Sequence, residues 1–117
     1  MPAKRNDRVA PPGPPDGWEA RFATNDAAKG WEQLCSTARS NTWEAFVVLT
    51  TRPTDPENRA RQHRLKGRLG RRDVHGKALD QWQYEVTSGG RIWCCPDPDK
   101  GIVWVVAAAT GHPKATD

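Results

Sequence analysis

The sequence predicts an α+β domain in which two N-terminal helices pack on one face of a small antiparallel sheet of about four strands. Three observations carry this prediction. Apolar residues recur at helical spacing from about residue 26 to residue 52. From residue 64 onwards, short alternating or apolar runs are separated by turn residues, as in a meander of strands. The 117 residues also suffice for only one domain with one core.

The composition favours a folded chain without metal or cofactor. Mean hydropathy is −0.83, but six tryptophans are more than a disordered chain would carry. The cysteines, Cys35, Cys94 and Cys95, are odd in number and do not suggest a disulfide framework. Cys94 and Cys95 are neighbours on a predicted strand and point to opposite faces, so they do not fit one tetrahedral zinc site.

The N-terminal residues 1–16 contain repeated proline and no apolar periodicity, which predicts a flexible or extended arm outside a folded domain at 17–117. Neither an apolar secretory core nor a membrane-length run occurs in the sequence. We therefore expect a cytoplasmic protein with no membrane partner.

The first elements are a short edge strand and a helical hairpin. The strand is expected near 18–22, followed by a helix over about 26–38 with Asn25 or Asp26 as its N-cap. A second helix is expected to begin after Asn41 and to end near residue 52, before a proline. Aromatic side chains of the two helices are expected to anchor the core, namely Trp31, Trp43 and Phe46.

The sheet is predicted from the second half of the chain. Residues 74–77 read as a hairpin turn between a strand near 66–74 and a longer strand near 79–87. Residues 91–95 form the next strand, and the apolar run 102–109 suits a central strand covered on both sides. With the helices on one face, the opposite face is expected to be open.

Positive charge is concentrated in one segment. The net charge is +4, and seven arginine or lysine residues lie between Arg59 and Arg72 with no acidic residue among them. Such a run is compatible with a solvated loop, but its position beside a sheet favours a phosphate-binding surface.

Strand alternation brings a possible catalytic set to the open face. Arg91 shares a face with Trp93, and Glu85 lies on the same side of the preceding strand. Arg91 is placed to bind a phosphate, to form a salt bridge with Glu85, or both. His112 follows the last strand and can exchange a proton near neutral pH, with the charge of Lys114 beside it. RNA cleavage without metal needs such a base, acid and fixed positive charge.

These residues resemble the RelE/ParE superfamily of bacterial type II toxins, in particular its RelE, YoeB and HigB ribonuclease branches. The resemblance covers about residues 18–117. It is carried by Leu65-Lys66-Gly67, by the strand 82–86 with the glycine hairpin through Arg91, and by the end of the chain at 111–114. It implies two helices packed against an antiparallel sheet of about four strands.

The resemblance also implies an activity, which is endonucleolytic cleavage of mRNA in the ribosomal A site and inhibition of translation. Arg91 would stabilise the transition state, with His112 and Glu85 as further catalytic residues. The implied RNA-binding set comprises His63, Arg64, Lys66, Arg68 and Lys114. Implied partners are mRNA with the ribosome and its rRNA, and a cognate antitoxin protein that covers the basic surface.

Departures from the family pattern leave alternatives open. RelE has lysines where this chain has Gln83 and Glu85, and no aromatic residue follows Trp104, so a C-terminal tyrosine cannot stack on a nucleobase. A ParE-like toxin that binds DNA gyrase would have the same fold without needing His112. A basic RNA-binding domain without catalysis is the third alternative.

Overall fold

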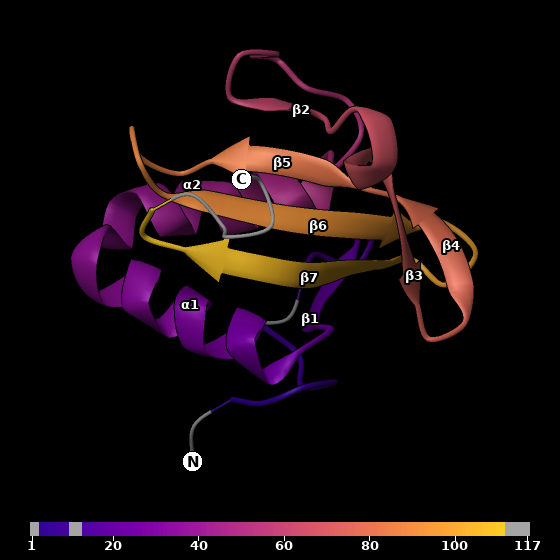
Figure 1. Ribbon diagram of the computed structural model, residues 1–117. Coiled ribbons are helices and arrows are strands. Elements are labelled where there is room, and N and C mark those ends of the chain that lie inside the picture. Colours follow the sequence, from indigo (N-terminus) through magenta and orange to yellow (C-terminus); the bar gives the residue numbers. More distant parts are fainter. Residues whose placement is uncertain (1–2, 10–12, 112–117) are drawn as a thin grey trace.

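Two helices cover one face of a five-stranded sheet in this computed structural model, which describes residues 3–9 and 13–111 (Figure 1). The elements in chain order are β1 (Glu19–Phe22), α1 (Asn25–Thr37), α2 (Arg39–Thr51), β2 (Gln62–Arg64), the 3-10 helix η1 (Gly67–Gly70), β3 (Arg71–Val74), β4 (Lys77–Asp80), β5 (Trp82–Glu85), β6 (Arg91–Asp97) and β7 (Ile102–Ala109).

The sheet is mixed and larger than the sequence predicted. Its order is β1-β7-β6-β5-β2, and all pairs are antiparallel except β1 with β7, which run parallel. A second, two-stranded sheet consists of β3 and β4. The α+β class and the helical pair are confirmed. The count of about four strands is only roughly met, since the main sheet has five. The sheet is not purely antiparallel, because the last strand, β7, pairs parallel with the first, β1.

Helix α1 lies directly on β7. Its N-cap is Thr24, one residue before the predicted cap, and the Thr24 hydroxyl accepts the Ala27 N–H at 2.9 Å. A side chain at Gly30 would place its Cβ 1.6 Å from the Ala108 carbonyl oxygen. Gly30 lowers helix propensity, but it allows the backbones of α1 and β7 to approach closely.

The core between helices and sheet contains most of the apolar residues that the sequence assigned to it. Trp31 and Phe46 are buried there, as predicted. Trp43 is 55% exposed, so its predicted role as a core anchor is wrong. It lies on the outer side of α2 and stacks on Phe46 with ring centroids 5.6 Å apart.

Residues 3–9 are packed on the edge of the sheet. The Asn6 N–H donates to the Phe22 carbonyl at 2.7 Å, and the Val9 N–H donates to the Ala20 carbonyl at 2.8 Å. Val9 is only 1% exposed and belongs to the core. The expectation of a flexible arm therefore does not hold for residues 3–9, because their backbone extends the pairing of β1.

The predicted long strand over 79–87 divides at Gln81. Residues before it form β4, which pairs with β3, and residues after it form β5 in the large sheet. The predicted turn is confirmed, with φ of +53° at His75 and +82° at Gly76. A two-residue turn of this kind matches the twist of a tight hairpin.

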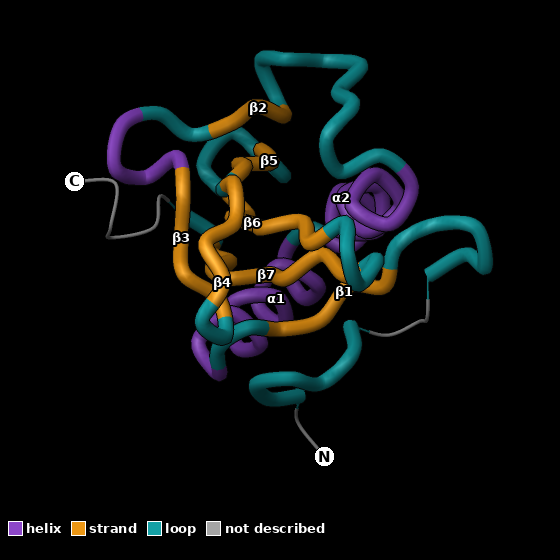
Figure 2. The backbone as a smooth tube through the Cα atoms, turned by 90° about the vertical axis from the view of Figure 1, so that its right-hand side faces the viewer, coloured by secondary structure: helices purple, strands orange, loops and turns teal. Residues whose placement is uncertain are grey.

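The β3–β4 hairpin crosses the second face of the sheet, as Figures 1 and 2 show. Val74 and Leu79 pack there against Trp93, Cys95 and Trp104 in a second apolar cluster. The Lys77 ammonium holds the hairpin to the end of β6 through the Asp97 carboxylate at 2.9 Å. The described residues therefore cover one end of the second face, and the prediction that this face is wholly uncovered is wrong.

Candidate nucleic-acid interface

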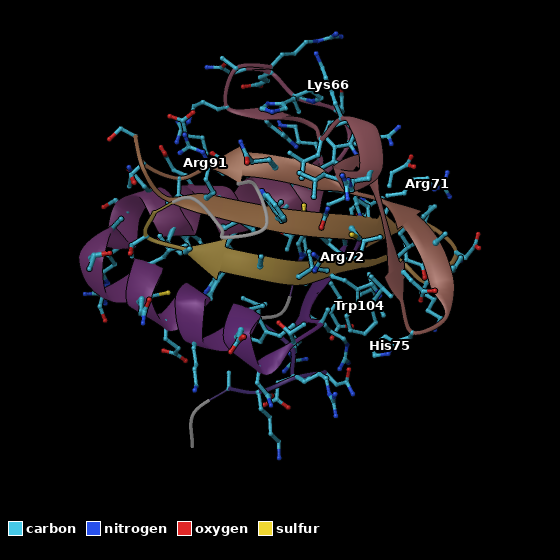
Figure 3. All side chains as sticks on the ribbon, in the orientation of Figure 1. Lys66, Arg71, Arg72, His75, Arg91 and Trp104 are labelled. Carbon is cyan, nitrogen blue, oxygen red and sulfur yellow. The ribbon has the colours of Figure 1, made fainter. Side chains whose placement is uncertain are left out.

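Glu85 and Arg91 meet at the uncovered end of the second face. They are cross-strand partners in β5 and β6, and both lie opposite the helices, as the alternation predicted. The nearest atoms are the Arg91 Nη2 and the Glu85 Oε2, 3.9 Å apart. Figure 3 shows Arg91 at the start of β6, at the end of the strand that the hairpin does not reach. The predicted salt bridge is thus formed at the limit of ion-pair distance.

Most of the Arg91 guanidinium is occupied by the protein itself. Its Nη1 donates to the carbonyl oxygens of Thr87, Ser88 and Gly90 at 3.0, 3.2 and 3.1 Å, and its side chain is only 10% exposed. Nε has no partner among the described residues. Arg91 therefore stabilises the turn between β5 and β6. Because Nε is buried, only Nη2 remains for a ligand.

His112 and Lys114 lie outside the described residues. The described chain reaches Gly111, two residues beyond Ala109, which is the β7 partner of Arg91. The predicted convergence of three catalytic groups is therefore observed only for Glu85 and Arg91.

His63 lies on the same face, opposite the β5 residue that is two positions before Glu85. It pairs with Gln83, and the Gln83 Oε1 accepts a hydrogen bond from the Trp93 Nε1 at 2.9 Å. Rows on one face are two residues apart, or roughly 7 Å. Along this face, the Glu85–Arg91 pair comes first, His63 and Gln83 come next, and the end covered by the hairpin follows.

The other predicted RNA-binding residues divide into a structural arginine and exposed cations. The Arg64 Nη2 donates to the Gly70 carbonyl at 2.8 Å and lies 3.3 Å from the Asp80 carboxylate, so Arg64 holds η1 against β4. Lys66 and Arg68 are exposed and form no ion pair with the described residues. Of the predicted RNA-binding residues that the structure describes, these two cations remain available to an anionic ligand.

Arg72 ends the basic run at 59–72 but was not among the predicted RNA-binding residues. Arg72 and Val74 alternate with exposed neighbours in β3 and thus lie on the inner side of the hairpin. Burial raises the pKa of the Cys95 thiol to about 12, and the positive charge of Arg72 opposes this rise. Arg72 therefore lies close to the sheet, as Figure 3 also shows, and strand alternation in 71–74 was the signal that indicated it.

Sequence reasoning also missed a cleft on the far side of β2. It has a volume of about 330 Å³ and lies between α2 and the β2–β5 edge, where Trp43 and Val47 are exposed. The Arg61 guanidinium lies 5.4 Å from the Tyr84 ring centroid at its floor. No sequence pattern indicated this cleft, because it depends on how α2 lies beside β2.

Within residues 3–9 and 13–111, no group of three or more histidine, cysteine or acidic side chains is arranged to hold a metal ion. In the same part of the chain, no helix is long and apolar enough to cross a membrane. Comparison with protein-family models, curated proteins and solved structures found no match for this chain.

Proposed function

We propose that the protein is a metal-independent endoribonuclease of the RelE/ParE type, a toxin that cleaves mRNA and inhibits translation. The observation that carries this proposal is the Glu85–Arg91 pair on the open end of the sheet face. A carboxylate beside an arginine supplies two of the three functions that cleavage of an RNA phosphodiester needs.

The roles follow from the chemistry of each group. The Glu85 carboxylate takes the proton of the ribose 2′-hydroxyl, and the 2′-oxygen attacks the phosphorus. The Arg91 Nη2 donates to the phosphate oxygens, whose negative charge rises in the transition state. His112 gives its proton to the departing 5′-oxygen, which leaves a 2′,3′-cyclic phosphate on the upstream fragment.

The charge distribution supports mRNA on the ribosome as the substrate. Lys66 and Arg68 are exposed beside β2, and they suit contacts with the phosphates of mRNA or rRNA. An antitoxin with acidic and apolar residues would cover the same surface in the cytoplasm of the producing cell. The mRNA, the ribosome and the antitoxin are part of the proposed function, which the mapping of mRNA cleavage sites tests.

A second candidate is an RNA-binding domain without catalysis. It is favoured by the three carbonyl contacts of the Arg91 Nη1, which leave less of this guanidinium for a transition state. In this case the same surface would bind RNA, and the Glu85–Arg91 pair would only stabilise the turn.

Primer extension on mRNA from cells that express the protein separates these candidates. We expect new cleavage sites with the parent protein and a loss of about 10²- to 10⁴-fold in cleavage rate for Glu85→Gln and for His112→Ala. The matched control is Arg39→Ala, which removes an exposed arginine from the first residue of α2. Arg39→Ala should cleave as the parent does.

Arg91→Ala needs a separate measure of folding. Removing its side chain leaves three carbonyl oxygens without their donor, which costs about 2–4 kcal/mol of stability. Glu85→Gln is nearly isosteric and is therefore the deciding variant. If its cleavage equals that of the parent, the nuclease proposal fails. Growth arrest with DNA damage signalling and no new mRNA ends would favour a gyrase-binding toxin instead.

A further inference from the structure

A small cavity lies on the same sheet face, at the opposite end from Arg91. It has a volume of about 210 Å³, opens to solvent, and is lined by the N-terminal segment, the start of α1, the β3–β4 hairpin and β7. Its lining residues are Arg5, Ala23, Thr24, Arg72, Asp73, Val74, His75 and Val106. Three of these side chains are basic, and they come from two segments far apart in the sequence.

The cavity carries uncompensated positive charge. Arg5 and Arg72 form no ion pair with the described residues. Among the described residues, the only carboxylate in the lining is that of Asp73, and its Oδ1 accepts the Gly76 N–H at 2.8 Å within the hairpin turn. The excess charge therefore favours an anion in this cavity.

Specific contacts hold the basic residues in place. The Arg5 N–H donates to the Asn25 Oδ1 at 2.8 Å, which fixes the N-terminal segment beside the start of α1. The His75 ring meets Trp104 edge to face with centroids 4.7 Å apart. His75 and Asn6 are the non-glycine residues with positive φ in the described chain, at +53° and +72°. The basic groups are thus placed by the fold rather than by a loose loop.

The position of Arg72 connects the cavity with the Glu85–Arg91 pair. Arg72 lies beside Cys95, and Cys95 is four residues along β6 from Arg91, which corresponds to about 13 Å. Figure 3 shows Arg72 over the sheet, between Arg91 and the turn that holds His75. A polyanion that crosses this face from Arg91 would therefore meet Arg72 and then the cavity.

We propose that this cavity is a second phosphate-binding site, which takes a backbone phosphate of the single-stranded RNA whose scissile phosphate lies at Arg91. Arg5 and Arg72 donate to the phosphate oxygens, and His75 completes the site from the hairpin turn. The choice of RNA rests on the proposed function, whereas the anion site itself rests on the cavity and its charges. An acidic protein segment is the other class of ligand, and the experiment distinguishes the two.

The test is equilibrium binding of a short 2′-O-methyl oligouridylate, which cannot be cleaved because its 2′-oxygen is blocked. Binding is measured over a range of salt concentrations for the parent, Arg5→Ala, Arg72→Ala and His75→Asn, with Arg39→Ala as the control on the helix layer. We expect about five- to tenfold weaker binding for each arginine variant, and a salt slope that falls by about 0.7 for each lost phosphate contact. Arg39→Ala should retain both values.

His75→Asn separates binding from folding. Asparagine before glycine is favoured at a turn with positive φ, so this variant retains the hairpin while it removes the imidazole. We expect His75→Asn to melt at the same temperature as the parent but to bind the oligonucleotide more weakly. If both His75→Asn and Arg72→Ala bind the oligonucleotide as tightly as the parent does, the second phosphate-binding site is overturned.

The remaining outcomes separate this inference from the proposed function. If the protein does not cleave mRNA, but the arginine variants lose affinity and salt slope, the second site stands and the nuclease proposal fails. If the parent cleaves and the variants bind and cleave as it does, the second site is overturned alone. A polyglutamate peptide serves as the acidic protein ligand. If an equal concentration of this peptide displaces the oligonucleotide from the parent but not from Arg72→Ala, the ligand is an acidic protein segment and RNA is overturned as the ligand.

Discussion

The two faces of the five-stranded sheet differ in how they are covered. On the helix face, alternate residues such as Ile92, Cys94 and Val105 all belong to one apolar core. On the opposite face, Trp93 and the residues after it are covered by the β3–β4 hairpin. At the start of β6 the same face carries a buried arginine instead.

The difference shows where this molecule leaves side chains for a ligand. The two helices cover most of one face, so the inward residues of β6 and β7 on that face serve the core (Figure 1). A cleft remains on this face beside β2. Among the described residues, the hairpin covers only one end of the opposite face (Figure 1), and the Glu85–Arg91 pair lies at the other end. Apolar side chains need cover from water, whereas polar ones at an open end are available for binding.

The largest expected effect comes from disturbing the helix face at Gly30. Gly30→Ala places a Cβ 1.6 Å from the Ala108 carbonyl oxygen, so α1 must move away from β7. We expect a loss of more than about 4 kcal/mol in the free energy of unfolding, measured by chemical denaturation. This loss occurs although alanine has the better helix propensity.

The control is Gly111→Ala, because no atom of the described residues other than its chain neighbours lies within 4 Å of a Cβ built at Gly111. It should leave stability unchanged to within about 0.5 kcal/mol. If Gly30→Ala were as stable as the parent, α1 would not pack on β7 at the distance described here.

A smaller effect is expected from the covered end of the opposite face. Trp93 is fully buried, and Trp93→Ala leaves a cavity and removes the hydrogen bond to Gln83, at a cost of about 3–5 kcal/mol. Trp43→Ala, at a tryptophan that is 55% exposed on α2, should cost about 1 kcal/mol or less. Thermal or chemical unfolding of both variants measures the contrast. Equal losses would contradict the assignment of Trp93 to a covered face and of Trp43 to the surface.

The sequence predicted what depends on local pattern. Alternation placed Glu85 and Arg91 on one face, and turn chemistry located the hairpin at His75 and Gly76. The helical spacing identified both helices. The same spacing placed Trp43 in the core, however. An aromatic residue near the buried side of a helix fits the helical periodicity whether or not other elements cover that part of the helix.

What could not be predicted depends on contacts between distant segments. The parallel pairing of β1 with β7 and the packing of residues 3–9 on β1 involve partners that no local pattern identifies. The division of a strand at Gln81 sends β4 across the sheet, and this crossing creates both the covered end and the cavity at Arg72. The candidate site was therefore predicted at its Glu85–Arg91 end and missed at its other end.

The smallest effect compares two neighbouring residues, one on each face. Cys94 faces the helices and Cys95 faces the hairpin, and burial raises the pKa of both thiols above the ordinary value of 9.0, that of Cys95 to about 12. Above about pH 9 the unfolded chain loses these protons while the folded chain retains them. The free energy of unfolding should therefore fall as pH rises, by up to about 1.4 kcal/mol per pH unit for each thiol.

Replacing both cysteines by alanine isolates this contribution. The pKa of Lys77 is raised by its hydrogen bonds to Asp99 and Asp97, and that of Tyr84 is raised by burial, but both residues remain in the variant and so contribute equally to both proteins. Denaturation between about pH 8 and about pH 10 should give a shallower decline for Cys94→Ala/Cys95→Ala than for the parent. Single variants then compare the two faces. If Cys95→Ala declines with pH just as the double variant does, only the thiol on the hairpin side is shielded. Parallel declines in the parent and the double variant would show that neither cysteine is buried as described, and the hairpin would then not close its end of the sheet.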